Sequence, residues 1–281
     1  MPEAPHATDL SSVLTPKTLR LSGWLALFSI AIGLGLHHSE ANVQLLLWLH
    51  RHPSLPDAAW LFITQWGDSA QALVLLLALF LHRPLPLSWV LKTWLMGVIA
   101  SPLLKSAWDT ARPLAVVDPS WLHPIGQPPM GQHAMPSGHA LAAGSMAAIL
   151  FFSLSLHRDG RPYGWRFALV FCCFLVAVSR VVVGAHWPGD VAVGWGLGWL
   201  LVLLAMRWEQ AQAWAKPLAS NAAGWWVLAL QAVLLWAVWH LPTEGWGMSL
   251  SRAVVTGVAL VAFARALQRR RVLFGAGSSH D

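Results

Sequence analysis

The chain has 281 residues, of which 56% are hydrophobic and only 11% are charged, and its mean hydropathy is +0.55. Soluble domains carry about 25% charged residues, so this composition excludes an ordinary water-soluble fold and favours a protein embedded in a lipid bilayer. The formal net charge of +6 would suggest nucleic-acid binding in a soluble protein. Here the basic residues fall in short loops between apolar runs, which is typical of membrane topology signals, and we expect a membrane and no nucleic acid as partner.

The N-terminal region predicts a tail followed by a first membrane span. Residues 1–20 are rich in Pro, Ser and Thr and are expected to form a cytoplasmic tail. The first apolar run, about 21–36, has no small-residue cleavage site before or after it, so we interpret it as a transmembrane helix and not as a removed signal peptide. Residues 37–66 are mixed and cannot all cross the bilayer. A second span is expected over 69–81, although it is short unless it begins near Phe62 and includes Asp68.

The remaining apolar runs predict six further spans and a long Pro-rich loop over 105–136. Each run is longer than a β-strand and none alternates with period two, so helices are expected. The predicted fold is an all-α, polytopic transmembrane helix bundle, with a six-helix core and two C-terminal transmembrane helices. We expect a tail over 1–20, a transmembrane domain over 21–206, and a C-terminal hairpin with a basic tail over 207–281. The six further spans are 90–104, 138–156, 167–184, 191–206, 223–240 and 250–266.

The distribution of positive charge predicts the orientation of the bundle. With the N-terminal segment inside and the spans alternating, 13 of the 18 Lys and Arg residues fall on the cytoplasmic side and 5 on the opposite side. The positive-inside rule supports this orientation. It also favours an even number of spans, because the basic run 269–271 then lies inside. We therefore predict a multi-pass protein of the inner (plasma) membrane. The five outside cations are Arg51, Lys105, Arg112, Arg180 and Arg252.

Three polar segments fall at span ends on the non-cytoplasmic side, and alternation of the spans alone brings them to one face. They are KSAWDTARP over 105–113, PSGH over 136–139 and SRVVVGAHWPGD over 179–190. In order, they fit the pattern KxxxxxxRP, PSGH and SRxxxxxHxxxD. On these residues the chain resembles the type 2 phosphatidic acid phosphatase (PAP2) superfamily, in its membrane lipid phosphatase branch. The resemblance covers about residues 60–206.

The resemblance implies an enzyme that hydrolyses a lipid phosphate or diphosphate through a phosphohistidine, with the site facing the periplasm or exterior. His186 is implied as the nucleophile and His139 as the general acid and base. Asp190 is expected to accept a hydrogen bond from one nitrogen of His186, which orients the ring. The local chemistry alone does not assign these roles. The implied phosphate-binding residues are Lys105, Arg112, Ser137, Gly138 and Arg180.

The residue types fit phosphoryl transfer, which is catalysed mainly by positioning and by fixed positive charge around the phosphate oxygens. Arg180 is the strongest single indication, because a charge inside an apolar run is costly and usually functional. Lys105 and Arg112 could be ordinary loop charges. Asp109 is expected to pair with one of these two side chains.

Structural roles compete with the catalytic ones at two of these positions. Ser137 could serve as the N-cap of the span that follows it, although a helix N-terminus also presents free N–H groups to an anion. Asp190 could be a capping acid at the start of its span. The adjacent cysteines, Cys172 and Cys173, lie in an apolar run and are interpreted as small core residues. The sequence has no metal-ligand spacing, so we expect no metal and no cofactor.

Three functions remain to be compared. The first is hydrolysis of a lipid such as an isoprenyl diphosphate (undecaprenyl diphosphate, for example), phosphatidylglycerol phosphate or lipid A. The second is a lipid phosphotransferase that passes the phosphoryl group to another lipid. A transporter would need charges along the spans, and apart from Asp68 and Arg180 the spans hold almost none. The sequence does not name the lipid, the oligomeric state or the role of the two C-terminal spans.

Overall fold

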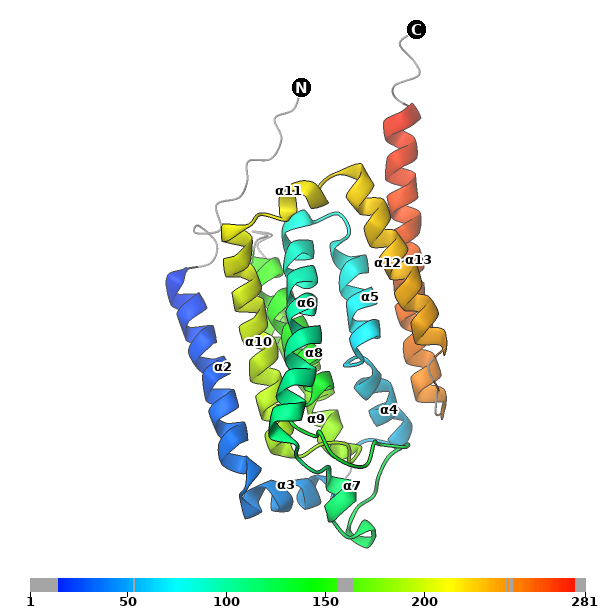
Figure 1. Cartoon of the computed structure of the whole chain (residues 1–281). Helices are drawn as coiled ribbons and strands as arrows, with labels where there is room; N and C mark the ends of the chain where they lie inside the picture. Colours follow the sequence, from blue (N-terminus) through cyan, green and yellow to red (C-terminus); the bar gives the residue numbers. More distant parts are fainter. Residues whose placement is uncertain (1–14, 53, 156–163, 241, 243–244, 276–281) are drawn as a thin grey trace.

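The computed structural model describes residues 15–52, 54–155, 164–240, 242 and 245–275, and every regular element within them is a helix (Figure 1). Residues 1–14 of the predicted tail lie outside the described residues. Arg158 and Arg161, two of the 13 basic residues assigned to the cytoplasmic side, also lie outside them. The elements in chain order are α2 (Pro16–His37), α3 (Glu40–Arg51), α4 (Asp57–Gln65), α5 (Ser69–Phe80), α6 (Pro84–Trp108), α7 (Pro113–Val116), the 3-10 turn η1 (Pro119–Trp121), α8 (Gly138–Ser155), α9 (Gly164–Val182), α10 (Pro188–Ala211), α11 (Ala215–Leu218), α12 (Asn221–His240) and α13 (Gly245–Gly275).

The long helices confirm the predicted all-α membrane bundle. Among the described residues, six helices are long and apolar enough to cross a bilayer, namely α2, α6, α9, α10, α12 and α13. The bent pair α4 and α5 would be a seventh span, and α8 is apolar but shorter over Gly138–Leu154. Helix α2 begins at Pro16, five residues before the predicted start of the first span, because Thr15 caps it by accepting a hydrogen bond from the backbone of Thr18.

The second predicted span is a broken helix. Helices α4 and α5 meet at an angle of 61° across residues 66–68. Asp68 lies at the break, where its side chain accepts hydrogen bonds from the backbone N–H groups of Ala70 and Gln71, each at 3.1 Å. A carboxylate in this apolar run is therefore used to cap the N-terminus of α5.

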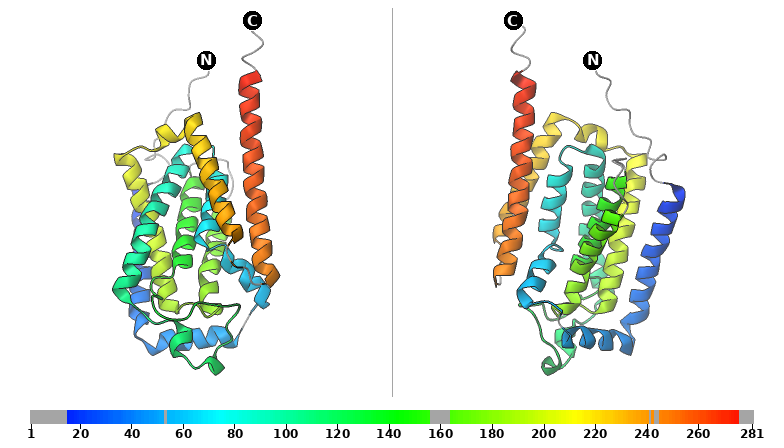
Figure 2. Two further views of the ribbon diagram at one scale, coloured as in Figure 1. Left: turned by 45° about the vertical axis from the view of Figure 1, so that its right-hand side comes forward. Right: turned by 180° about the vertical axis from the view of Figure 1, so that it is seen from behind.

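The helices place the long loops at one end of the bundle and the start of α2 and the end of α13 at the other. Helix α3 lies across the end where α7 and the loop before α8 are found (Figure 1). Helix α2 begins and α13 ends at the opposite end, and the views in Figure 2 agree on this arrangement. Helices α12 and α13 pack on the side of α5, and α13 also contacts α4.

Close contacts of glycine hold α8 against α10. A Cβ atom on Gly194 would lie 2.5 Å from the carbonyl oxygen of Ser137, and one on Gly198 would overlap the carbonyl oxygen of Leu141. The two glycines are four residues apart, so they share one face of α10. Small residues at this spacing allow membrane helices to approach backbone to backbone. The contact fixes the start of α8 relative to the start of α10.

A buried ion pair connects α6 with α10 at the end where α2 begins. Lys92 Nζ donates to Glu209 Oε2 and to the carbonyl oxygen of Gln212, both at 2.6 Å. Lys92 Nζ also lies 5.2 Å and 5.0 Å from the ring centroids of Trp208 and Trp214. Because both charges are paired and hydrogen-bonded, the lysine is accommodated without exposure to solvent.

The glycine contact predicts a strong and position-dependent effect of adding one methyl group. Gly198→Ala should lower the unfolding temperature in detergent, because α8 and α10 must separate, at a cost of about 1–3 kcal/mol. Gly257→Ala on α13 is the matched control, since no atom lies within 4 Å of the added Cβ. The control should unfold at or above the temperature of the unmodified protein, because alanine favours a helix. Equal unfolding temperatures for the two variants would contradict the close packing.

Candidate active site

The three polar segments meet at the end of the bundle that carries α3 and α7. Two short loop stretches pair first: Arg112 N donates to the carbonyl oxygen of Gly131 at 2.8 Å, and Ala134 N donates to that of Thr110 at 2.9 Å. These bonds bring the first segment beside the PSGH segment. In turn, Ser137 N donates to the carbonyl oxygen of Asp190 at 3.1 Å, which joins the second segment to the third.

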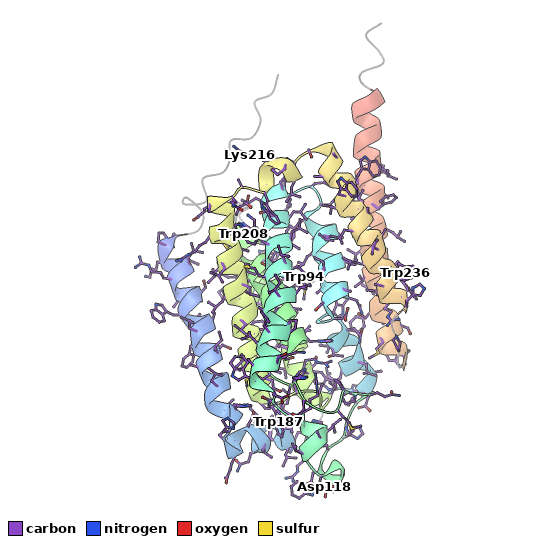
Figure 3. The ribbon with its side chains drawn as sticks, in the orientation of Figure 1. Trp94, Asp118, Trp187, Trp208, Lys216 and Trp236 are labelled. Atoms are coloured by element: carbon purple, nitrogen blue, oxygen red, sulfur yellow. The ribbon has the colours of Figure 1, made fainter. Side chains whose placement is uncertain are left out.

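Trp187 lies where the first segment meets the third (Figure 3). Its indole Nε1 donates to the carbonyl oxygen of Ala111 at 2.8 Å, one residue before Arg112. Figure 3 also shows Trp187 and Asp118 at the same end of the bundle, opposite the end that carries Trp208 and Lys216. The structure therefore brings the three polar segments together at one end of the bundle, as predicted.

Helix α3 supports the segment that carries His186. The side chain of Asn42 accepts a hydrogen bond from Gly189 N at 3.0 Å. His50 Nδ1 accepts from His123 N at 3.3 Å, so its other ring nitrogen carries the proton and donates to the carbonyl oxygen of Val181 at 3.0 Å. Burial lowers the pKa of His50 and keeps the ring neutral, as these two bonds require. The sequence did not reveal these supporting roles.

The contacts of His186 define its tautomer. Arg112 Nη1 lies 3.3 Å from His186 Nε2, and a guanidinium can only donate, so Nε2 presents its lone pair. The proton is then on Nδ1, which lies 3.4 Å from Asp190 Oδ2. This separation is long for a hydrogen bond, as is common for catalytic contacts before substrate binds. The arrangement leaves Nε2 as the nitrogen that can attack an electrophile.

Burial and positive charge keep the imidazole of His186 neutral. The ring is 3% exposed, and its pKa lies well below the usual 6.5, first because of burial and then because of the charges on Arg180, Arg112 and Lys105. A protonated imidazole has no lone pair to offer. The same surroundings that attract a phosphate therefore hold His186 in the form that can act as a nucleophile.

Asp190 has the capping role considered from sequence, and it also lies close to His186. Its Oδ2 accepts a hydrogen bond from Trp187 N at 2.9 Å, so it caps the start of α10. The same oxygen faces His186. The carboxylate is fully buried, and its Oδ1 has no hydrogen-bond partner among the described residues. The cap fixes the position of the carboxylate, and the carboxylate in turn faces the histidine.

Three cationic side chains surround this pair. Arg112 Nη1 is anchored on the carbonyl oxygen of Ala185 at 3.0 Å. Arg180 Nη1 donates to Thr64 Oγ1 at 2.7 Å. Lys105 lies within electrostatic range of both arginines and of Asp190. The cations thus converge from two of the three polar segments, Lys105 and Arg112 from the first and Arg180 from the third, and such a group of charges can bind a phosphate dianion.

The start of α8 adds His139 and an open helix N-terminus. His139 lies within electrostatic range of His186 and of the three cations. Ser137 is fully buried, and its Oγ accepts from Ala140 N at 3.4 Å, so it caps α8. A Cβ on Gly138 would meet no atom within 4 Å, so the backbone there is accessible.

A cavity of about 300 Å³ begins at Gly138 and extends between α6 and α8. Most of its lining is apolar, from residues such as Leu141 and Val98. Ser101 and Ser145 add hydroxyl groups. The cavity therefore begins at one of the candidate site residues and runs along the mostly apolar space between α6 and α8.

Two observations were not anticipated from sequence. The expected pairing of Asp109 with Lys105 or Arg112 is wrong: its carboxylate lies 3.3 Å from His133 Nδ1 on an exposed loop. Asp109 ends α6 with a φ of 36°, which turns its side chain into the loop that follows. Thr64 was missed as a partner of Arg180, because a single threonine near the end of an apolar run gives no sequence signal.

Within the described residues, no group of three or more His, Cys, Asp or Glu side chains is arranged to hold a metal ion.

Two known proteins are similar in sequence to part of this chain. An undecaprenyl-diphosphatase of Sulfolobus acidocaldarius is 29% identical over 117 residues, which are 42% of this chain and 52% of that protein. A lipid A 1-phosphatase of Rhizobium etli is 29% identical over 171 residues, which cover 51% of this chain and 68% of that protein. The alignment with the first of these relatives therefore spans only about half of its length.

The fold itself also has a counterpart among solved structures. The crystal structure of LpxE from Aquifex aeolicus matches with a TM-score of 0.52 at 20% identity, over 61% of this chain and 98% of that one. Residues 85–214 match the family model described as the PAP2 superfamily, and this range contains all three polar segments. This match covers less than half of the chain, and over residues 85–214 the chain is similar to members of the PAP2 superfamily.

Proposed function

We propose that this chain is an integral membrane phosphatase that hydrolyses a lipid phosphate or diphosphate through a phosphohistidine on His186. The observation that supports this most directly is the buried His186 itself. Its Nδ1 faces Asp190 and its Nε2 lone pair faces Arg112 inside a group of three cations. The names of the relatives, an undecaprenyl-diphosphatase and a lipid A 1-phosphatase, support the same class of reaction.

In the first step, His186 Nε2 attacks phosphorus and the bond to the leaving oxygen breaks. A phosphate bound among the three cations neutralises the charge that disfavours a protonated imidazole, so His139 carries its second ring proton when substrate is bound and donates it to that oxygen. Asp190 stabilises the positive charge that develops on His186. Lys105, Arg112 and Arg180 neutralise the equatorial phosphate oxygens. Ser137 Oγ and the backbone N–H of Gly138 add donors at the start of α8.

In the second step, His139 accepts a proton from a water molecule as that water attacks phosphorus. The phosphorus–nitrogen bond breaks, inorganic phosphate leaves, and His186 regains its lone pair. Transfer to another lipid would follow if a lipid hydroxyl or phosphate replaced this water. A phosphotransferase therefore shares the phosphohistidine and differs only in the acceptor.

We propose that the cavity beside Gly138 accommodates part of the lipid chain. It runs from the start of α8 into the apolar space between α6 and α8, so a headgroup held by the cations would lie at its mouth. An isoprenyl diphosphate, phosphatidylglycerol phosphate or lipid A would each present an anionic phosphate above an apolar chain. We assign the catalytic unit to residues 21–206 and a C-terminal hairpin with a basic tail to 207–281.

The nucleophile is tested by His186→Ala. Phosphate release from lipid phosphates should fall roughly 1,000-fold or more, because the covalent intermediate cannot form. Labelled substrate should leave acid-labile phosphate on the unmodified protein and none on the variant. His123→Ala is the matched control, an exposed histidine at the same end of the bundle. Turnover by His186→Ala equal to that of the control would remove the proposed nucleophile.

Activity should survive EDTA and be inhibited by vanadate. The three cations supply the charge that a divalent ion would otherwise contribute, and the described residues offer no cluster of metal ligands. Vanadate can adopt the five-coordinate geometry of phosphorus in transfer on His186. Phosphate release should be measured after dialysis against EDTA and in a vanadate titration. Loss of activity with EDTA that only a divalent cation restores would refute the metal-independent mechanism.

We propose that the protein lies in the inner (plasma) membrane with its site facing the periplasm or exterior. The 13-to-5 distribution of Lys and Arg supports this orientation. In a background with Cys172 and Cys173 replaced by Ala, Ser120→Cys should react with an impermeant thiol reagent in intact cells, and Ser220→Cys should not. Both serines are exposed and lie in loops at opposite ends of the bundle. The reverse labelling pattern would rule out an outer-leaflet substrate.

A further inference from the structure

The break between α4 and α5 lies directly against the candidate site, although it is outside the family-matched range 85–214. Thr64, in the last turn of α4, is 1% exposed and accepts the 2.7 Å hydrogen bond from Arg180. A Cβ on Gly67 would lie 3.0 Å from His139 Cβ and 2.9 Å from Val176 Cγ1. The backbone at the break is thus packed tightly against both the acid histidine and α9.

The bond to Thr64 determines which edge of the Arg180 guanidinium is free. Thr64 occupies Nη1, while Nε is buried and has no hydrogen-bond partner in the part of the chain that the structure describes. The edge formed by Nε and Nη2 matches two oxygens of a phosphate. A hydroxyl that holds Nη1 therefore fixes the plane of the fork and leaves this bidentate edge for the anion.

A second set of buried polar contacts connects α13 to the same break. Ser251 Oγ, fully buried on α13, donates to Gln71 Oε1 at 3.0 Å. Gln71 Nε2 donates to Gln65 Oε1 at 2.7 Å, which spans the break from α5 to α4. Gln65 directly follows Thr64 in the chain. The contacts Ser251–Gln71–Gln65 thus form a continuous hydrogen-bond chain from α13 to the residue beside Thr64.

Helix α13 also touches α4 backbone to backbone. A Cβ on Gly247 would overlap the carbonyl oxygen of Ala58, so the start of α13 has no room to shift towards α4. The close contact and the hydrogen-bond chain together fix α4 relative to α5. A bent helix joined by only three residues would otherwise be free to change its angle.

We infer that Thr64 is a positioning residue for the phosphate-binding Arg180, and that α13 sets the position of Thr64 through the Ser251–Gln71–Gln65 chain. The inference rests on the proposed function, and it gives the C-terminal hairpin a role in anion binding. Displacement of a phosphate-binding group by about 1 Å is enough to reduce turnover strongly. The coupling therefore acts through the geometry of Arg180 and not through contact of Thr64 with substrate.

Thr64→Val keeps the shape of the side chain and removes the hydroxyl. Since a hydrogen bond to a charged group is lost, orthovanadate affinity, measured by isothermal titration calorimetry on purified protein in detergent, should fall roughly ten- to a hundred-fold. The ratio kcat/KM for lipid phosphate should fall by a similar factor. Thr64→Ser keeps the hydroxyl and should retain affinity within roughly three-fold of the unmodified protein. The unfolding temperature of each variant should be measured as well. An unchanged unfolding temperature shows that weaker vanadate binding comes from a misplaced Arg180 and not from loss of the fold.

The contribution of α13 is tested by a matched pair of serines. Ser251→Ala removes the donor to Gln71 and should weaken vanadate binding roughly two- to ten-fold. Ser249→Ala, on the exposed side of the same helix, should bind vanadate as the unmodified protein does. Equal affinities in these two variants would overturn the role of α13.

The remaining outcomes separate this inference from the proposed function. Vanadate affinity unchanged in Thr64→Val, or lost equally in Thr64→Ser, would overturn the positioning role. If the unmodified protein bound vanadate but released phosphate from no lipid, the proposed function would fail, and the affinities of the variants would still decide the inference. If the unmodified protein did not bind vanadate, both the proposed function and the positioning role of Thr64 would be refuted.

Discussion

The concentration of positive charge at one end of an apolar bundle is the constraint on which the site depends. Burying a guanidinium is costly unless its donors are satisfied. Arg112 and Arg180 each place one donor on a fixed acceptor, the carbonyl of Ala185 and the hydroxyl of Thr64. The buried carboxylate beside these cations, that of Asp190, already caps α10 and faces His186. The excess of positive charge therefore favours an anion, and the loops and helix ends are tied together so that this charge stays in place.

Much of this arrangement could be predicted from sequence because its causes are local. Apolar runs long enough to cross a bilayer predicted the helices, and the alternation of spans predicted that Lys105, His139 and His186 share one face. Hydropathy and chain direction require no knowledge of distant contacts. The assignment of nucleophile and acid to the two histidines depended on family resemblance, and the tautomer of His186 became accessible only through its distance to Arg112.

What the sequence could not predict depends on contacts between residues far apart in the chain. The 61° bend between α4 and α5 is held by α13, about 180 residues later. The partner of Arg180 is Thr64, and Asp109 turns towards His133 and away from the cations. In each case the local sequence allows several partners, and tertiary packing selects one. The hydrogen-bond partners of short polar side chains inside apolar runs are therefore the hardest contacts to predict from the sequence.

The positions of the first and last helices have a practical consequence. Helix α2 begins and α13 ends at the end of the bundle away from His186 (Figure 1). An affinity tag, a fluorescent protein or a surface linker attached ahead of α2 or behind α13 would therefore be joined to the bundle at the end away from α3 and α7. Protein immobilised through such a tag in a supported membrane or nanodisc would present its site to added lipid vesicles without obstruction. Detection of released phosphate on a sensor surface could then be carried out with either terminus attached.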